Sequence, residues 1–375
     1  MFLIALKILL YDKVRSLITL MGVIFAVCLI FAQVGIYMGL MEASSILIDN
    51  TEGDIWVISK NSRNFDFAQP FPEYFYEQAL SVEGVKSAEK LVVAWHLIKN
   101  KQGGTEQIEI VGFNPDTGIG GPWKMVTGMP YDVKNGDFFI VDESSMKRLG
   151  NIKVGDYREV GRKRLKLVGI SEGVRSFTTA PMVFTSYNLA QRVVEYVGPD
   201  CTVFIVIKAA AGYNPDLVVE KLKSRLKDVD IYTKEDFSMK TRLYWSIETG
   251  IGFSFLLTIL ISFAIGILIV GQTIYNSTVE HIKEFGTLKA LGAFNVDIYK
   301  IIFSQAILNA LIGFILSLAI SLVSVKIYKA SGMVMIMTAP VNIAVLAMTL
   351  LMCLAAAFVS IRKIRKIDPA ILFRG

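Results

Sequence analysis

The sequence predicts an α-helical membrane protein with four transmembrane helices and a mixed α/β domain inserted between helices 1 and 2. Three observations predict this fold class. The chain of 375 residues is 53% hydrophobic and only 19% charged, whereas soluble domains are usually about one quarter charged. Its most apolar residues gather in four uncharged runs. One long polar segment separates the first run from the other three.

Each of the four runs is long enough to cross a bilayer, which takes about 20 helical residues. The runs cover residues 16–41, 250–272, 301–325 and 341–361. The first is too long for the apolar part of a signal peptide, and no small-residue cleavage site follows it, so we expect a retained helix. Charged groups inside spans usually mark proton or ion paths. Their absence from these runs argues against a proton-coupled transporter or a hydrophilic channel within one subunit.

Basic residues at the two ends of the chain predict its orientation. The tail 362–375 carries five basic residues and one acidic residue, and residues 1–15 carry three basic residues and one acidic residue. The positive-inside rule therefore places both termini in the cytoplasm and the large domain on the other side of the membrane. Lys326 and Lys329 favour the opposite orientation, because they lie in a loop expected outside, but the larger number of basic residues at the termini outweighs them.

This orientation gives each segment of the chain an expected place. The order is a cytoplasmic N-terminal amphipathic helix (1–15), a first span (16–41), an extracytoplasmic α/β domain with stalk helices (42–249), a second span (250–272), a cytoplasmic coupling loop (273–300), a third span (301–325), a short outside loop (326–340), a fourth span (341–361) and a cytoplasmic tail (362–375).

The inserted domain alternates β-rich runs with helical stretches, separated by Gly, Pro and Asn. We expect strands at residues 54–58, 90–97, 106–113, 137–142, 164–170, 182–185 and 202–207, and helices at 75–80, 144–149, 187–196 and 215–226. Helix-like spacing of Phe237, Tyr244 and Ile247 suits a stalk helix packing on a neighbour, although an ordinary linker fits the same residues.

Motifs for enzyme chemistry are missing from the sequence. It contains no Gly-x-x-x-x-Gly-Lys-Ser/Thr phosphate loop, no Gly-x-Ser-x-Gly elbow, no His-Glu-x-x-His and no Cys-x-x-Cys. Asp142 and Glu143 follow an expected strand and are better explained as a cap of the next helix than as catalytic acids. Two histidines and three cysteines are too few and too scattered for a metal site or a disulfide framework. We therefore expect no enzyme activity and no bound cofactor or metal. The net charge of +6 fits basic loops at a membrane better than a nucleic-acid surface.

The loop between the second and third spans carries the most informative pattern. Residues 276–289 mix charged and apolar side chains in a pattern suited to a short amphipathic helix. Such a helix at the membrane face can insert apolar side chains into a groove on a partner protein. A helix that only lies on lipid headgroups would show the same pattern.

Within this loop, residues 284–293 read Glu-Phe-Gly-Thr-Leu-Lys-Ala-Leu-Gly-Ala and resemble the coupling segment of FtsX-like permeases. These are the membrane subunits of macrolide-exporter-like (MacB-type) ABC systems. His281 stands where relatives usually have arginine, and Gln305 where they often have glutamate. The C-terminal Asp-Pro-Ala-Ile-Leu-Phe-Arg at 368–374 is also similar to the family, as is the order of one span, a large domain and three spans.

The resemblance implies a permease whose ATP and magnesium are bound by a separate ABC ATP-binding subunit, which docks on the coupling loop. It also implies a homodimer of this chain. The expected docking residues are Glu280, His281, Lys283, Glu284, Phe285, Gly286, Leu288 and Lys289. Gly35 and Gly39 form a Gly-x-x-x-Gly pair that would let two helices approach closely in such a dimer. Glycine is common in spans, however, so the pair has a chance explanation as well.

The inserted domain is most similar to that of DevC-type heterocyst glycolipid exporter permeases, through residues 121–123, 139–143 and 174–177. This similarity implies export of a lipid, a glycolipid or another hydrophobic substrate from the membrane, with a periplasmic membrane-fusion adaptor and a TolC-like outer-membrane duct. A lipoprotein-releasing or cell-wall-hydrolase-regulating permease is the alternative within the family. A membrane-anchored sensor or enzyme whose outside domain binds a ligand is the alternative outside it.

Overall fold

The computed structural model describes residues 7, 11, 13–101, 103–174, 176, 180–330 and 334–364. The chain divides into two compact units. One is helical and consists of Met1–Gly39 and Ile251–Gly375; the other is the α/β unit Leu40–Gly250. Each unit has its own hydrophobic core.

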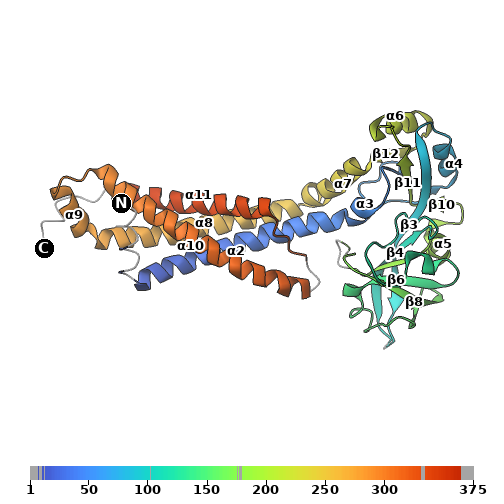
Figure 1. Ribbon diagram of the computed structural model, residues 1–375, viewed down its shortest axis with the longest axis horizontal. Coiled ribbons are helices and arrows are strands. Elements are labelled where there is room, and N and C mark those ends of the chain that lie inside the picture. The colour runs from blue at the N-terminus through green and yellow to red at the C-terminus, as the bar shows by residue number, and fades with distance from the viewer. Residues whose placement is uncertain are drawn as a thin grey trace. The chain divides into compact units, whose positions relative to one another are not determined.

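Four long helices build the helical unit and lie side by side (Figure 1). They are α2 (Lys13–Ser44), α8 (Ile251–Glu280), α10 (Asn295–Ala330) and α11 (Ala339–Ile364). Each contains a window of mean hydropathy between 2.4 and 2.7 and is long enough to cross a membrane. The prediction of four spans is confirmed. Every helix extends past its apolar run at one end or both, because the apolar run marks only the part suited to hydrocarbon.

Small side chains and hydroxyl groups join these helices to one another. A Cβ at Gly266 of α8 would lie 2.0 Å from Sδ of Met352 in α11, so any larger residue here would force the Met352 side chain to move. Ser360 Oγ of α11 donates a hydrogen bond of 2.7 Å to the Gly271 carbonyl of α8. Ser317 of α10 bonds in the same way to a carbonyl of α2, at 3.2 Å. Such contacts hold helices together where lipid removes the hydrophobic driving force.

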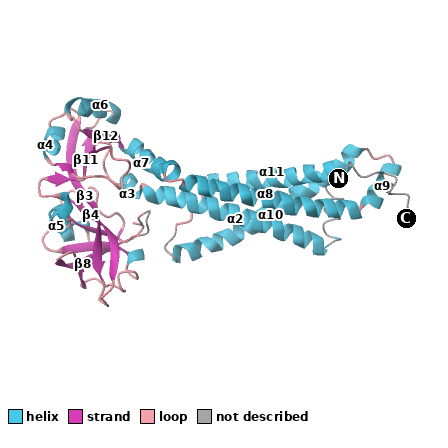
Figure 2. Cartoon of the chain, turned by 180° about the vertical axis from the view of Figure 1, so that it is seen from behind, coloured by secondary structure: helices cyan, strands magenta, loops and turns pink. Residues whose placement is uncertain are grey.

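Twelve strands lie among the described residues of the α/β unit, where Figure 2 shows all the magenta arrows. They are β1 (Ile55–Ser59), β2 (Phe71–Pro72), β3 (Val85–Lys99), β4 (Thr105–Phe113), β5 (Met125–Thr127), β6 (Phe138–Asp142), β7 (Tyr157–Val160), β8 (Lys163–Ser171), β9 (Met182–Ser186), β10 (Cys201–Thr202), β11 (Phe204–Ala209) and β12 (Val229–Thr233). The main sheet has the order β12-β1-β11-β3-β4-β9-β6-β8-β5, with β7 paired to β3 and β8. The first half of β3 pairs with β11 and the second half with β4.

Short helices cover the strands of the α/β unit. They are α3 (Ile46–Asn50), α4 (Tyr74–Leu80), α5 (Tyr187–Val193), α6 (Pro215–Arg225) and α7 (Lys234–Leu243), followed by a π-helical turn at Tyr244–Glu248. Short 3₁₀ turns lie at Pro130–Val133, Glu143–Ser145 and Glu195–Val197.

Strand β1 shows how these helices cover both faces of the sheet. Successive side chains of a strand point to opposite faces. Ile55 and Val57 therefore share a core with Phe75 of α4 and with α6. Trp56 points the other way and packs on Phe237 of α7 at a ring-centroid distance of 5.6 Å. Of the residues with helix-like spacing, Phe237 lies in α7 and packs within the α/β unit, whereas Tyr244 and Ile247 lie in the π-helical turn that follows.

The seven expected strands are present, but the helix expected at 144–149 is not, and four strands were missed. Residues 144–149 form only a 3₁₀ turn and bends instead of a helix, because Gly150 and Asn151 both take left-handed backbone angles directly after them. Asp142 still caps this turn, since its side chain accepts the Ser144 N–H at 2.9 Å. Strand β12 was missed although its Val-Asp-Ile-Tyr-Thr sequence alternates apolar and polar residues. The short strands β2, β5 and β7 were also missed.

Candidate functional site

The expected docking segment lies in the connection between α8 and α10. Helix α8 continues to Glu280, the chain turns at His281, and a separate helix α9 (Ile282–Ala290) follows. Figure 1 shows α9 at one end of the helical unit. A single helix over 276–289 was therefore wrong at its start. Hydrogen bonds continue across the turn, from His281 N to Ser277 O and from Phe285 N to His281 O, so the turn bends the helix without freeing its backbone.

One side chain of α9 anchors the helix to the bundle. Phe285 is 6% exposed and packs in a core with Ile274 of α8 and with Ile298 and Ile301 of α10. Burying a phenylalanine removes a large apolar surface from water. Phe285 therefore fixes α9 against both helices that it joins.

A polar contact sets the turn that precedes α9. Nδ1 of His281 lies 2.9 Å from Oε2 of Glu284, three residues along the chain. The histidine is only 9% exposed, and its Nε2 is buried without a hydrogen-bond partner among the described residues. The Glu284 side chain is 66% exposed. His281 is thus part of the turn, while Glu284 reaches the surface.

The outer surface of α9 is open. A Cβ added at Gly286 would meet no atom within 4 Å, and Lys283 and Glu280 are exposed. The side chains of Leu288 and Lys289 lie outside the described residues. Of the eight expected docking residues, the structure therefore places Glu280, Lys283, Glu284 and Gly286 where a partner can reach them.

The residues after α9 add an apolar surface that sequence reasoning missed. Leu291, Phe294 and Val296 are 80%, 75% and 57% exposed. We call these three residues the apolar loop surface. The signal was present, because three large apolar residues follow one another in a short connection outside the apolar runs. Exposed apolar groups that gather in one place mark interaction surfaces more often than single ones do.

The Gly35 and Gly39 pair packs within the chain. A Cβ at Gly39 would lie 2.1 Å from the Val334 carbonyl oxygen, and a Cβ at Gly35 would lie 2.8 Å from the Met335 side chain. Ile336 N also donates to Gly35 O at 3.0 Å. The close approach expected of the pair occurs, but its partner is the segment before α11. The space that a second copy would need at these glycines is taken.

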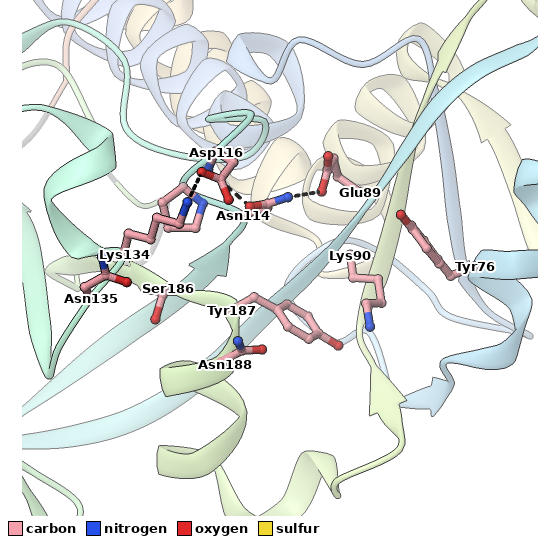
Figure 3. A pocket seen from close by; sticks show the side chains of 11 residues that line it. Tyr76, Glu89, Lys90, Asn114, Asp116, Lys134, Asn135, Ser186, Tyr187 and Asn188 are labelled. Carbon is pink, nitrogen blue, oxygen red and sulfur yellow. Dashed lines mark hydrogen bonds and ion pairs between the residues drawn. The ribbon is translucent and has the colours of Figure 1, made fainter.

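The α/β unit has a polar pocket of about 470 Å³ beside β3 and α5 (Figure 3). Lys134 bonds to Asp116, whereas Glu89 accepts a hydrogen bond of 3.0 Å from the neutral Asn114 amide. Lys90 lies 2.6 Å from Glu73. Burial alone would raise the pKa of the Glu73 carboxyl, but hydrogen bonds from Lys90 and Tyr187 bring it below its usual value. Both lysines of this pocket are therefore paired with a carboxylate, while Glu89 is held by an amide.

Comparison with known families matches both units. Residues 16–225 match the MacB-like periplasmic core domain, and residues 256–369 match the FtsX-like permease C-terminal domain. The first match alone covers more than half of the chain.

The individual relatives include proteins named as ABC transporter permeases, which align with this chain over almost their whole length. An uncharacterized ABC transporter permease of Mycobacterium tuberculosis is 23% identical over 99% of both chains. One from Mycobacterium bovis is 22% identical over 94% of this chain and 93% of its own. The solved periplasmic region of MacB from Actinobacillus actinomycetemcomitans covers 52% of this chain and 96% of its own, at 13% identity and a TM-score of 0.40.

The family-model matches, together with four membrane-spanning helices and an inserted α/β unit, establish the family. This chain belongs to the MacB-like and FtsX-like ABC transporter permeases.

Proposed function

We propose that this chain is the permease subunit of an ABC exporter and transmits ATP-driven movement from a separate ATP-binding subunit to the α/β unit. The observation that carries the proposal is the apolar loop surface beside an open α9. Large apolar side chains exposed to water on a connection between spans are unfavourable unless a partner or lipid covers them. The ATP-binding subunit is the partner that the family requires, and ATP hydrolysis belongs to that subunit.

The anchoring of α9 supports a mechanical role. Phe285 packs against both α8 and α10, so a displacement of α9 would move these two helices together. Helix α8 is also continuous in sequence with Tyr244–Glu248 of the α/β unit. Movement delivered at α9 would therefore reach that unit along the chain itself. Substrate can then be handled on the far side without a polar path through the spans.

The arrangement in the cell follows from the family and from the basic flanks. We infer that the protein lies in a bacterial inner membrane, with both termini and α9 in the cytoplasm and the α/β unit in the periplasm. It works as a homodimer with two ATP-binding subunits, through surfaces other than Gly35 and Gly39.

The substrate proposed is a lipid, a glycolipid or another hydrophobic molecule, delivered to a periplasmic adaptor and a TolC-like duct. Support comes from the similarity of residues 121–123, 139–143 and 174–177 to DevC-type permeases. The alternative is a lipoprotein-releasing or cell-wall-hydrolase-regulating permease, which would have the same spans and the same α9.

A pull-down of the tagged chain from its native membrane in mild detergent tests the proposal, with partners identified by mass. The test variant combines Glu284→Lys with Gly286→Trp. A Cβ at Gly286 meets no atom within 4 Å, so a side chain that begins there points into open space where a partner would dock. A second variant combines Leu291→Asp with Phe294→Asp. Met129→Asp, at a 68% exposed residue of the α/β unit, is the matched control.

We expect the wild type and the control to recover an ABC ATP-binding subunit and both test variants to lose it. Recovery of an adaptor together with the ATPase supports export, whereas recovery of a cell-wall hydrolase supports the alternative. Absence of any ATPase from the wild-type sample, under conditions that preserve other ABC complexes, would overturn the proposal.

A further inference from the structure

The polar pocket beside β3 and α5 has a size that suits a small ligand. Its volume is about 470 Å³, and small-molecule pockets in proteins usually measure about 300–1,000 Å³. Several elements meet around it: α4, β3, the turn after β4, the segment before β6 and the start of α5 (Figure 3). All the described residues that line it belong to the α/β unit.

The positive charges of the pocket are already used. Lys90 Nζ lies 2.6 Å from Glu73 Oε2, and Lys134 is paired with Asp116. An anionic ligand such as a phosphate or a carboxylate binds most strongly to free cationic donors. To bind here, such a ligand would have to break one of these ion pairs. The pocket therefore does not suit an anion.

Glu89 brings to the pocket a carboxylate that can accept more hydrogen bonds. The residue is only 9% exposed. Its Oε2 accepts the Asn114 amide N–H at 3.0 Å, and among the described residues no ion pair or hydrogen bond reaches its Oε1. An ionised carboxylate only accepts, and its two oxygens have about four acceptor sites. A ligand that donates hydrogen bonds would find a charged acceptor here, and such bonds are stronger than neutral ones.

Four neutral polar side chains line the same pocket and make no hydrogen bond through their side chains with any other described residue. They are Tyr76, Asn135, Ser186 and Asn188. Ser186 is 8% exposed, and its hydroxyl makes no capping bond to α5, which follows it. A buried hydroxyl without a partner is costly unless water or a ligand supplies the missing bond. Together these four side chains offer both donors and acceptors.

We propose that this pocket binds a neutral saccharide unit, whose hydroxyl groups donate to Glu89 and exchange hydrogen bonds with the four neutral side chains. A hydroxyl both donates and accepts, so a sugar ring that carries several of them matches this mixture of groups. A cationic amine only donates and would leave the amide N–H groups of Asn135 and Asn188 unpaired. An apolar ligand would leave every polar group here unpaired, at a cost for each. This inference concerns binding alone and is independent of the proposed function.

Saturation-transfer difference NMR on the full chain in sugar-free nanodiscs tests the proposal, because it detects weak ligands and shows which ligand protons touch the protein. The probes are the methyl glycosides of glucose, galactose, mannose and N-acetylglucosamine. We expect saturation of the ring protons of at least one of them.

Hexyl glycosides of the same sugars separate the two sources of a saccharide, a free glycan and the headgroup of a glycolipid. Empty nanodiscs correct for hexyl glycoside that enters the lipid. An affinity that the hexyl chain does not change supports the pocket as a site for a free glycan. Tighter binding, with saturation of the chain protons as well, supports it as a site for a glycolipid headgroup.

Two variants place the binding in this pocket. Glu89→Gln removes the charged acceptor, and we expect Kd to rise at least about tenfold. Asn188→Ala, at an exposed position, removes one neutral partner and should raise Kd about fivefold. The matched controls are Glu220→Gln and Gln107→Ala, which change an exposed carboxylate and an exposed amide outside the pocket. Both controls should bind as the wild type does.

Three results would overturn the proposal. Absence of saturation transfer to every saccharide in the wild type would mean that the pocket is not a sugar site. Binding that survives both Glu89→Gln and Asn188→Ala would place the saccharide elsewhere. Spermidine, a cationic probe, would assign the site to amines if it bound more tightly than every saccharide and lost its binding in Glu89→Gln. If Glu89→Gln fails to fold, Asn188→Ala and Asn135→Ala still decide the question, because both side chains are exposed.

Discussion

Arg242 Nη2 lies 2.6 Å from Asp49 Oδ2, which joins α7 to α3 inside the α/β unit. The guanidinium also donates from Nε to Ser45 Oγ at 2.8 Å. These two helices enclose the Trp56 face of the sheet, so this contact closes the core on that side.

Replacement of Arg242 by methionine should lower the thermal stability of the α/β unit. Both side chains are about one third exposed, so solvent screening limits the loss to about 1 kcal/mol. The matched control is Lys60→Met, which breaks the exposed pair with Asp228. We expect that control to show no measurable change. Thermal unfolding followed by circular dichroism compares the two, and equal effects would refute a special role for Arg242.

Truncation of Phe285 to alanine should loosen α9 from the bundle. Removal of a buried phenylalanine side chain typically costs about 3–5 kcal/mol. We therefore expect a lower unfolding temperature for the helical unit and weaker recovery of the ATP-binding subunit. Phe253→Ala, at a 67% exposed position of α8, is the control and should change neither.

The apolar loop surface should behave differently from Phe285. Leu291→Asp with Phe294→Asp should lose the partner while the unfolding temperature stays the same, because both side chains are already exposed. A fall in unfolding temperature equal to that of Phe285→Ala would place these two side chains in the core instead.

The stability of the α/β unit should fall as pH rises through the titration of Asp66 and Glu109. The folded-state pKa values of both acids lie above their unfolded values, so the folded state binds more protons in the window between them. The stability that this gives is present in acid and is lost as pH increases through the folded pKa. Thermal unfolding between about pH 5 and about pH 9 measures the slope, which should flatten in Glu109→Gln. A rise in stability over the same window in the wild type would contradict the assignment of the proton.

Gly39→Val should destabilise the helical unit even in a single copy of the chain. Its side chain would collide with the Val334 backbone, which cannot move like the end of a flexible side chain. Met38→Val, at a 42% exposed neighbour, is the control. Size-exclusion chromatography with light scattering separates this effect from dimerisation. A variant that keeps its unfolding temperature but loses a dimer would restore the role first expected of the glycine pair.

The sequence was most informative where one side-chain pattern has one structural solution. Uncharged apolar runs of sufficient length have no place but a membrane, so the four spans were predictable. The alternating strand β8 and the continuously apolar strand β11 were predictable for a similar reason. The turn at His281 was not predictable, because residues 276–280 fit the end of α8 and the start of α9 equally well.

Contacts between distant segments were the hardest to foresee. Gly35 and Gly39 predicted a close approach but not its partner. Small residues are needed equally for contact with a helix of another copy and for contact with the segment before α11. Burial raises the pKa of Glu109, and the charge of Asp66, 43 positions away in the printed sequence, raises it further. Neither carries a local pattern, and only the fold brings them together.

Strand β3 has a mechanical consequence of its own. Its 15 residues, at about 3.3 Å each, make a rod about 50 Å long. One end is stitched to β11 and the other to β4 and β7. The two halves of the sheet therefore cannot hinge freely about the middle of this rod without tearing a hydrogen-bonded ladder. A force applied to one half of the sheet would therefore tilt both halves together, and the sheet itself would bend little.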